Sequence, residues 1–146
     1  MKPKAFLDLA QKLSKEEKDE ASLRSSVSRS YYALFHSMRQ FFERSGERIP
    51  KGPEAHGTLR NYLSICNLLE VKKLATDLND LKTDRNESDY DLESYRFKEP
   101  NTVVLLFIKA RNAFNTFEEI VSTPDKRKHI VNGIQKYKDS IRPHQS

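Results

Sequence analysis

Arg85 and the polar residues after it form the group of side chains best suited to chemistry in this chain. Arg85 continues the apolar face of a predicted helix, one turn beyond Leu81. A guanidinium directed at a core is costly unless it is paired, and its planar fork fits two phosphate oxygens. Polar residues follow at once, namely Asn86, Ser88, Asp89, Tyr90 and Asp91. The alternative is that the helix frays at Arg85, whose charge then only interacts with the negative end of the helix dipole.

A second group of polar side chains lies along one face of a predicted helix over residues 24–42. The apolar face of this helix is formed at helical spacing by Val27, Tyr31, Leu34, Phe35, Met38, Phe41 and Phe42, which predicts a central, core-facing helix. The opposite face is formed by Ser25, Arg29, Tyr32, His36 and Gln40. His36 is a candidate acid or base, whereas a histidine in this position is more often a surface or satisfied one.

The C-terminal segment from Thr123 onward is basic. It contains six lysines and arginines against two aspartates, which accounts for four of the five net positive charges of the chain. Such a run is usually a solvated helix face, and the alternative is a contact surface for phosphates. Under the second interpretation Arg29, Lys126, Arg127 and Lys128 are candidate nucleic-acid-binding residues.

Several classes of site and location are disfavoured by composition. The four histidines are scattered without zinc-helix spacing and there is one cysteine, so we expect neither a metal site nor a cofactor. Cys66 lies among apolar residues and is expected to be a buried structural thiol in a reducing cytoplasm. The longest apolar run, 103–108, is too short to span a membrane.

Helical periodicity predicts an all-α bundle of five or six helices in a single domain over residues 1–146. The expected helices are 3–13, 15–46, 58–69, 71–85, about 102–123 and 125–141, the third and fourth being either continuous or bent. Ser14 and Glu17 predict a capping box before the second helix, and Gly46 predicts its C-terminal end. Asn101 or Thr102 is expected to cap the fifth helix, and 86–100 is expected to be a connecting segment.

Two stretches resemble a known family. Residues 28–36, SRSYYALFH, are similar to the S-R-x-Y-Y-A-x-x-H helix of small prokaryotic HEPN-domain proteins, and residues 81–92, LKTDRNESDYDL, are similar to their R-x-x-x-D-Y-D segment. The resemblance implies an all-α HEPN bundle, often a homodimer. Many members are metal-independent ribonucleases of toxin–antitoxin, CRISPR-linked or phage-defence systems. Others accompany nucleotidyltransferases as RNA- or nucleotide-binding partners.

The resemblance also implies roles for particular residues. The ribonucleases use an arginine, usually followed by a polar residue, and then a histidine after four to six residues. Arg85 and Asn86 match the front of this motif, but Tyr90 stands where a histidine is expected. As a ribonuclease, the chain would use Arg85 to stabilise the phosphorane and Asn86 to orient the phosphate, with His36 or Tyr90 as acid or base. The alternatives are a non-catalytic module that binds RNA, a nucleotide or a partner such as an antitoxin or nucleotidyltransferase, and a purely structural helical adaptor. We expect Arg85 to lie within reach of His36, Asp89 or Tyr90, either directly or across a dimer axis. We also expect self-association through a surface that includes either the polar stripe of Arg29, Tyr32 and His36 or the Arg85 region.

Overall fold

The structure is a computed structural model that describes residues 1–142, so the last four residues of the expected domain, 143–146, lie outside it. Its elements are α1 (Lys4–Glu16), α2 (Glu20–Arg44), α3 (Glu54–Ser64), α4 (Leu69–Tyr90), the short 3-10 helix η1 (Arg96–Lys98), α5 (Pro100–Ser122) and α6 (Pro124–Ile141). Residues 1–142 contain no strand. The prediction of an all-α bundle is therefore confirmed.

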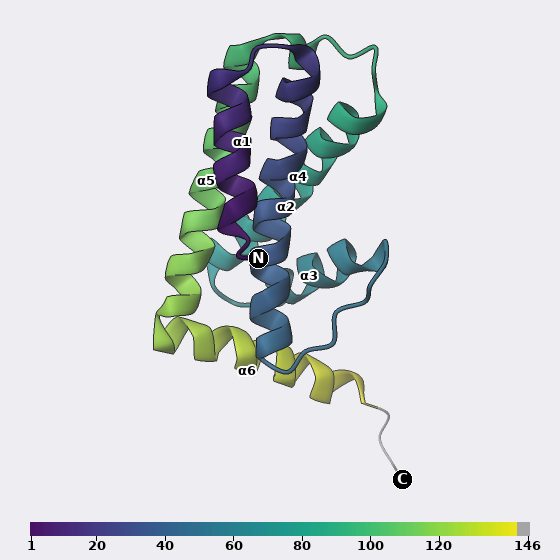
Figure 1. Ribbon diagram of the computed structural model, residues 1–146. Coiled ribbons are helices and arrows are strands. Elements are labelled where there is room, and N and C mark those ends of the chain that lie inside the picture. The colour runs from purple at the N-terminus through teal and green to yellow at the C-terminus, as the bar shows by residue number, and fades with distance from the viewer. Residues whose placement is uncertain (143–146) are drawn as a thin grey trace.

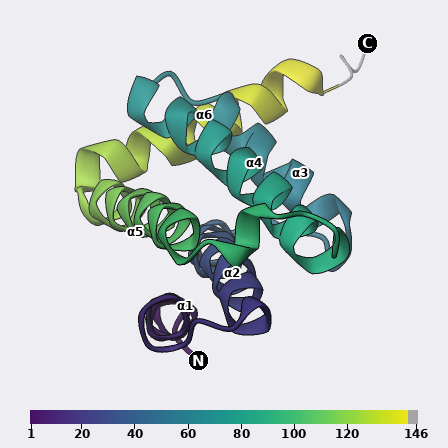
Figure 2. The same cartoon turned by 90° about the horizontal axis from the view of Figure 1, so that it is seen from above.

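Helix α2 is the central element of the bundle. It contacts α1, α3, α4 and α5, and seen from above it lies among α1, α4 and α5 (Figure 2). α1 runs beside its N-terminal part and α5 runs beside most of its length, while α3 and α6 lie toward its C-terminal end (Figure 1). This arrangement agrees with the central role predicted from the aromatic stripe of residues 24–42.

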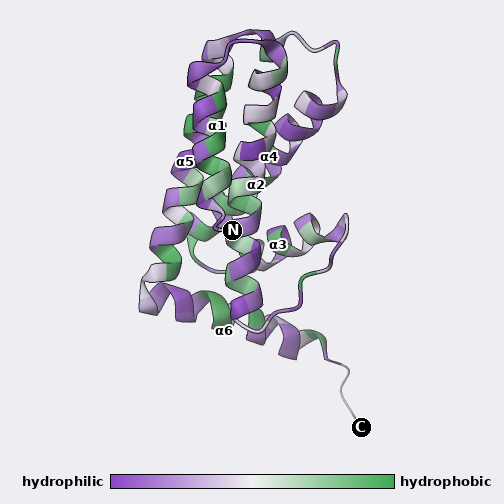
Figure 3. Cartoon of the chain, in the orientation of Figure 1, coloured by the Kyte–Doolittle hydropathy of each residue, from purple (hydrophilic) through white to green (hydrophobic). Residues whose placement is uncertain are grey.

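The core forms where the apolar stripes of α2 and α5 meet. Leu34, Met38 and Phe42 of α2 are fully buried, as is Phe117 of α5. Figure 3 shows hydrophobic positions concentrated on the inner sides of these helices, with hydrophilic turns outside. A smaller cluster at the other end of the bundle consists of Leu23, Val27, Phe97 and Val103. Both clusters hold α2 in place from several sides.

The start of α2 was predicted wrongly. Ser14 lies inside α1, and its hydroxyl donates to the carbonyl oxygen of Gln11 at 2.9 Å. The N-cap of α2 is Asp19, whose carboxylate accepts from the amide of Ser22 at 3.0 Å. Aspartate is as good an N-cap as serine, so the first helix continues and the second begins later. The predicted end is confirmed, because Gly46 has a φ of 92° and its amide donates to the carbonyl of Glu43 at 3.0 Å.

The boundaries of α3, α4 and α5 also differ from expectation. α3 begins and ends earlier than predicted, and α4 continues beyond Arg85 to Tyr90 into the segment expected to be a connection. That last turn lacks an apolar stripe and is held by tertiary hydrogen bonds described below. α5 begins at Pro100, with Glu99 as N-cap instead of Asn101 or Thr102, because proline is favoured at the first helical position.

The C-terminal helix is only partly packed. Ile130, Ile134, Tyr137 and Ile141 share one helix face at intervals of three and four residues. Ile130 and Ile134 are buried, but Tyr137 and Ile141 are exposed. α6 extends past the end of the bundle (Figure 1), so its last turns have no element to cover them. Cys66 is buried and free, in agreement with a structural thiol. Within residues 1–142, no helix combines the length and apolar character needed to cross a bilayer.

Candidate nucleic-acid interface

Helices α2 and α4 bring the two motif stretches of the sequence into contact. The guanidinium carbon of Arg85, on α4, lies 5.2 Å from the centre of the Tyr32 ring on α2. The Nε atom of Arg85 is 3.0 Å from Oδ2 of Asp89, and that oxygen accepts from the hydroxyl of Ser28 at 3.4 Å. The predicted contact of Arg85 with Asp89 is confirmed. A residue from each stretch therefore fixes the orientation of Arg85.

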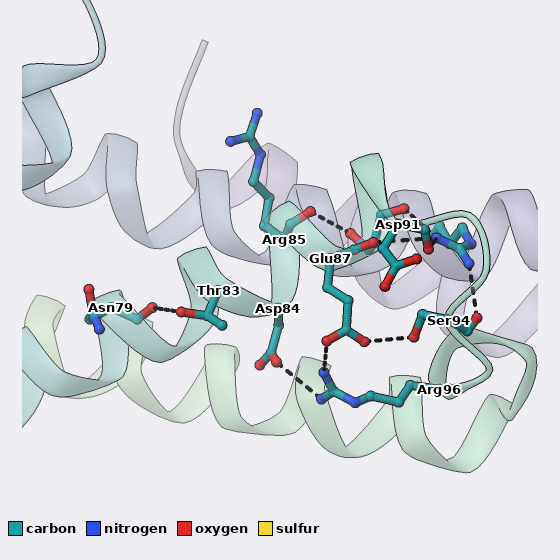
Figure 4. A network of polar contacts seen from close by, with 10 residues as sticks. Asn79, Thr83, Asp84, Arg85, Glu87, Asp91, Ser94 and Arg96 are labelled. Atoms are coloured by element: carbon teal, nitrogen blue, oxygen red, sulfur yellow. Dashed lines mark hydrogen bonds and ion pairs between the residues drawn. The ribbon is translucent and has the colours of Figure 1, made fainter.

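The Arg85 guanidinium is only partly used by the protein. Its Nη1 donates to Oδ1 of Asn86 at 3.0 Å, and the Tyr90 ring centre lies 5.7 Å away. Nε is at ion-pair distance from Asp89 but without hydrogen-bond geometry, and Nη2 makes no hydrogen bond within residues 1–142. The side chain, 18% exposed, projects from α4 away from Arg96 (Figure 4). It is therefore oriented by neighbours and still able to bind an anion.

A second arginine lies against the same tyrosine. Arg29 is 5.5 Å from the ring centre of Tyr32 and equally far from that of Phe6 on α1. A guanidinium over an aromatic face is attracted by the ring quadrupole. We call the surface formed by Arg29, Tyr32 and Arg85 the arginine–tyrosine surface. It presents two cations and one aromatic ring within a small area.

His36 borders this surface without contacting Arg85. Its ring stacks on Phe6, with centres 5.4 Å apart and planes at 14°, and also lies 5.9 Å from Tyr32. Burial, and then the positive charge of Arg39, lower the pKa of His36 below its usual value. The imidazole is thus neutral at pH 7. It makes no hydrogen bond or ion pair with Arg85 within residues 1–142, so the expected direct contact is not found in one chain.

Arg24 is a positioning residue that sequence reasoning missed. It is buried on α2 and donates to the carbonyl oxygens of Ser88 and Asp91 at 2.9 Å each and of Ser94 at 3.1 Å. The bonds to Ser88 and Asp91 satisfy orphan carbonyls at the C-terminal end of α4, and the bond to Ser94 holds the turn that follows. The signal was in the sequence, because Arg24 continues the apolar face of α2 one turn before Val27. A guanidinium directed at a core is costly unless it is paired, and this argument, made above for Arg85, predicts a paired Arg24 as well.

A polar network holds the turn after α4 (Figure 4). Arg96 donates to Asp84 and to Glu87 at 3.0 Å each. The hydroxyl of Ser94 donates to the other carboxylate oxygen of Glu87 at 2.7 Å. The Ser94 hydrogen bond, followed by those of Arg96, lowers the pKa of Glu87. Asp84, Glu87 and Arg96 lie on the side of α4 opposite Arg85 (Figure 4). Their hydrogen bonds therefore restrain the helix without occupying the arginine–tyrosine surface.

A buried tyrosine–histidine pair lies behind the surface. The phenol oxygen of Tyr31 is 2.9 Å from Nδ1 of His56 on α3. Burial raises the pKa of Tyr31 and lowers the pKa of His56 to about 4. The ring of Tyr31 lies edge-on to Tyr32, with centres 5.2 Å apart. Both groups are therefore uncharged at pH 7 and support Tyr32 from the core.

The basic C-terminal residues lie apart from Arg85. Lys126 forms an ion pair with Glu70 at 2.9 Å, Arg127 donates to the carbonyl of Val121 at 3.3 Å, and Lys128 is exposed. They lie at the start of α6, whereas Arg85 lies near the far end of α4 (Figure 1). Among residues 1–142, no group of three or more histidine, cysteine, aspartate or glutamate side chains is placed to hold a metal ion.

The two motif stretches, which lie in contact on α2 and α4, resemble those of HEPN-domain proteins. Comparison with known protein families gives the same result, because the HEPN domain family matches residues 2–127. The chain belongs to the HEPN-domain family. This places it in an RNA-related superfamily that includes nucleases. The match ends within the first turn of α6. No curated protein and no solved structure matches this chain.

Proposed function

We propose that this HEPN protein binds RNA through the arginine–tyrosine surface. The observation that supports this best is the placement of two guanidinium groups over Tyr32, at 5.2 and 5.5 Å from the ring centre. Arginine forks suit phosphate oxygens, and an aromatic ring beside them can stack on an unpaired base. Asp89 and Asn86 orient Arg85 from one side, which leaves Nη2 available for phosphate.

A metal-independent endoribonuclease is the second candidate, because the neutral His36 imidazole lies beside the same ring as Arg85. In this reaction His36 would accept the proton of a ribose 2′-hydroxyl while the 2′-oxygen forms a bond to phosphorus. The bond from phosphorus to the 5′-oxygen then breaks, and Tyr90 would protonate that oxygen. Arg85, oriented by Asn86, would stabilise the charge of the phosphorane.

We propose a homodimer formed beside the arginine–tyrosine surface, where Tyr90 is 75% exposed and Leu92 is similarly exposed. Such paired apolar residues beside a polar site suit a symmetric interface. A cleaving dimer would act as a toxin or defence protein with an antitoxin partner. A binding dimer would fit a partner of a nucleotidyltransferase.

Binding and cleavage of tRNA and of single-stranded RNA by the wild type, Arg85→Lys and His36→Ala separate the two candidates. Under the binding proposal, Arg85→Lys weakens affinity and His36→Ala leaves it unchanged. Under the ribonuclease proposal, His36→Ala abolishes cleavage yet spares binding, because proton transfer contributes to rate and not to ground-state affinity. Arg111→Lys is the matched control, since Arg111 lies over Phe107 on α5 at 5.8 Å. Equal affinity of Arg85→Lys and Arg111→Lys proteins would refute the phosphate role of Arg85.

A further inference from the structure

A cavity of about 590 Å³ lies where the start of α1 meets the C-terminal half of α2, the end of α5 and the start of α6. Its apolar lining consists of Pro3, Phe41, Phe114 and Val121. The ring of Phe41 is held edge-on to those of Phe42 and Phe117, with centres 5.1 and 5.7 Å away. The volume falls in the usual range of small-ligand pockets, about 300–1,000 Å³. The cavity therefore offers a fixed aromatic wall to one flat group.

The polar lining of this cavity is strongly basic. Four cationic residues line it, namely Lys2, Lys4, Arg44 and Arg127. The single carboxylate in the lining, Glu118, accepts a hydrogen bond from Ser37. Within residues 1–142, Lys2, Arg44 and Arg127 form no ion pair, and Lys4 lies 4.0 Å from the exposed Asp8. Unpaired cations around an apolar wall favour a ligand that joins a flat base to anionic groups.

One face of α2 connects this cavity to the arginine–tyrosine surface. Arg29, Tyr32, His36, Gln40 and Arg44 follow one another at intervals of three and four residues and so share a face of the helix. Gln40 and Arg44 also line the cavity. At ~1.5 Å per residue, the distance along the helix from Tyr32 to Arg44 is about 18 Å. A single strand of a few nucleotides covers such a distance, at the lower end of the ~4–16 nucleotides bound by single-strand-binding domains.

We infer that the cavity is a second RNA subsite, which takes one unstacked base against Phe41 while Arg44 and Arg127 contact the adjacent phosphates. This inference rests on the proposed RNA binding and specifies its substrate as single-stranded RNA long enough to reach both positions. The first contact is at Arg85 and the second in the cavity. The basic start of α6, separate from Arg85 in the fold, thereby joins the same binding path.

The test measures binding of a fluorescent ten-nucleotide single-stranded RNA as a function of salt. The variant Arg44→Gln/Arg127→Gln is compared with Arg60→Gln/Lys72→Gln, which removes the same charge from exposed positions of α3 and α4. We expect the cavity variant to bind about tenfold more weakly, with the slope of log K against log salt reduced by about 1.4 for two lost phosphates. The control should bind like the wild type. Arg44 and Arg127 are exposed, so thermal unfolding of the variant should match the wild type.

Photo-crosslinking with the same RNA containing 4-thiouridine locates the base. The wild type should cross-link within the tryptic peptide 40–44, which contains Phe41. Cross-links confined to other peptides, or equal affinity of the cavity and control variants, would overturn the inference. If Arg85→Lys still weakens binding in that case, the proposed RNA function survives. If the wild type binds no RNA, the proposed function and this inference both fail.

Discussion

Replacing Arg24 by methionine tests how the end of α4 is held. Methionine keeps an unbranched apolar stem but removes the donors to the carbonyl oxygens of Ser88, Asp91 and Ser94. Hydrogen bonds that involve a charged group contribute about 1.5–3 kcal/mol each. The ion pair with the partly exposed Glu20 contributes little by comparison.

The two 2.9 Å bonds of Arg24 set the expected magnitude of this loss. Some of the freed carbonyls lie near solvent and will bond to water instead, so we expect about 3–4 kcal/mol of lost unfolding free energy. For a chain of this length that corresponds to a melting temperature lower by about 10 °C. Local effects should be larger than global ones, because the bonds are concentrated in the last turn of α4.

Thermal and urea unfolding followed by circular dichroism measure the global effect, and hydrogen exchange measures the local one. Amides of residues 86–91 should exchange faster in Arg24→Met than in the wild type. Arg44→Met, an exposed arginine on the same helix, should change stability by less than about 0.5 kcal/mol. A loss below about 1 kcal/mol for Arg24→Met, or unchanged exchange at 86–91, would refute this account of α4.

Three further predictions concern pH, packing and assembly. Because the pKa of His56 is about 4 in the fold and ~6.5 when unfolded, its contribution to the free energy of unfolding is fully present above pH 6.5. It should decline by up to ~1.4 kcal/mol per pH unit between pH 6.5 and 4, and a His56→Phe variant with an equally steep decline would contradict this. Phe35→Ala and Phe114→Ala should each lower unfolding free energy by about 3–5 kcal/mol, since the side chains are 8% and 6% exposed; urea titrations showing under 1 kcal/mol would refute that packing. Sedimentation at tens of micromolar should show a dimer that Tyr90→Arg disrupts, and a strictly monomeric wild type would rule the dimer out.

The sequence predicted those features of the fold that depend on residues within a single helix or its end. The apolar stripe of α2 and the positive-φ Gly46 follow from local spacing and turn chemistry, so both were predictable. The interaction of Arg85 with Asp89 is an i, i+4 pair on one helix and was within reach of the same reasoning. The burial of Arg24 was accessible by that logic but was overlooked.

Features that depend on distant segments were not predictable. The last turn of α4 lacks an apolar stripe, and it is helical because Arg24, 64 residues earlier than Ser88, caps its carbonyls. Tyr137 has core spacing but no element to pack against, since α6 runs past the bundle. The basic cavity brings together Arg44 of α2 and Arg127 of α6, which are far apart in the sequence. The periodicity within each helix does not predict that they lie close together.

The salt dependence of RNA binding by wild-type, Arg85→Lys and Arg85→Gln proteins tests the central claim most directly. Lysine keeps the charge of Arg85 but loses its two-pronged grip on phosphate. We therefore predict about tenfold weaker binding for Arg85→Lys with an unchanged slope of log K against log salt. For Arg85→Gln we predict weaker binding and a slope smaller by about 0.7, the value for one lost phosphate contact on a single strand. Wild-type affinity in Arg85→Lys together with a wild-type slope in Arg85→Gln would contradict the account and leave Arg85 a structural residue.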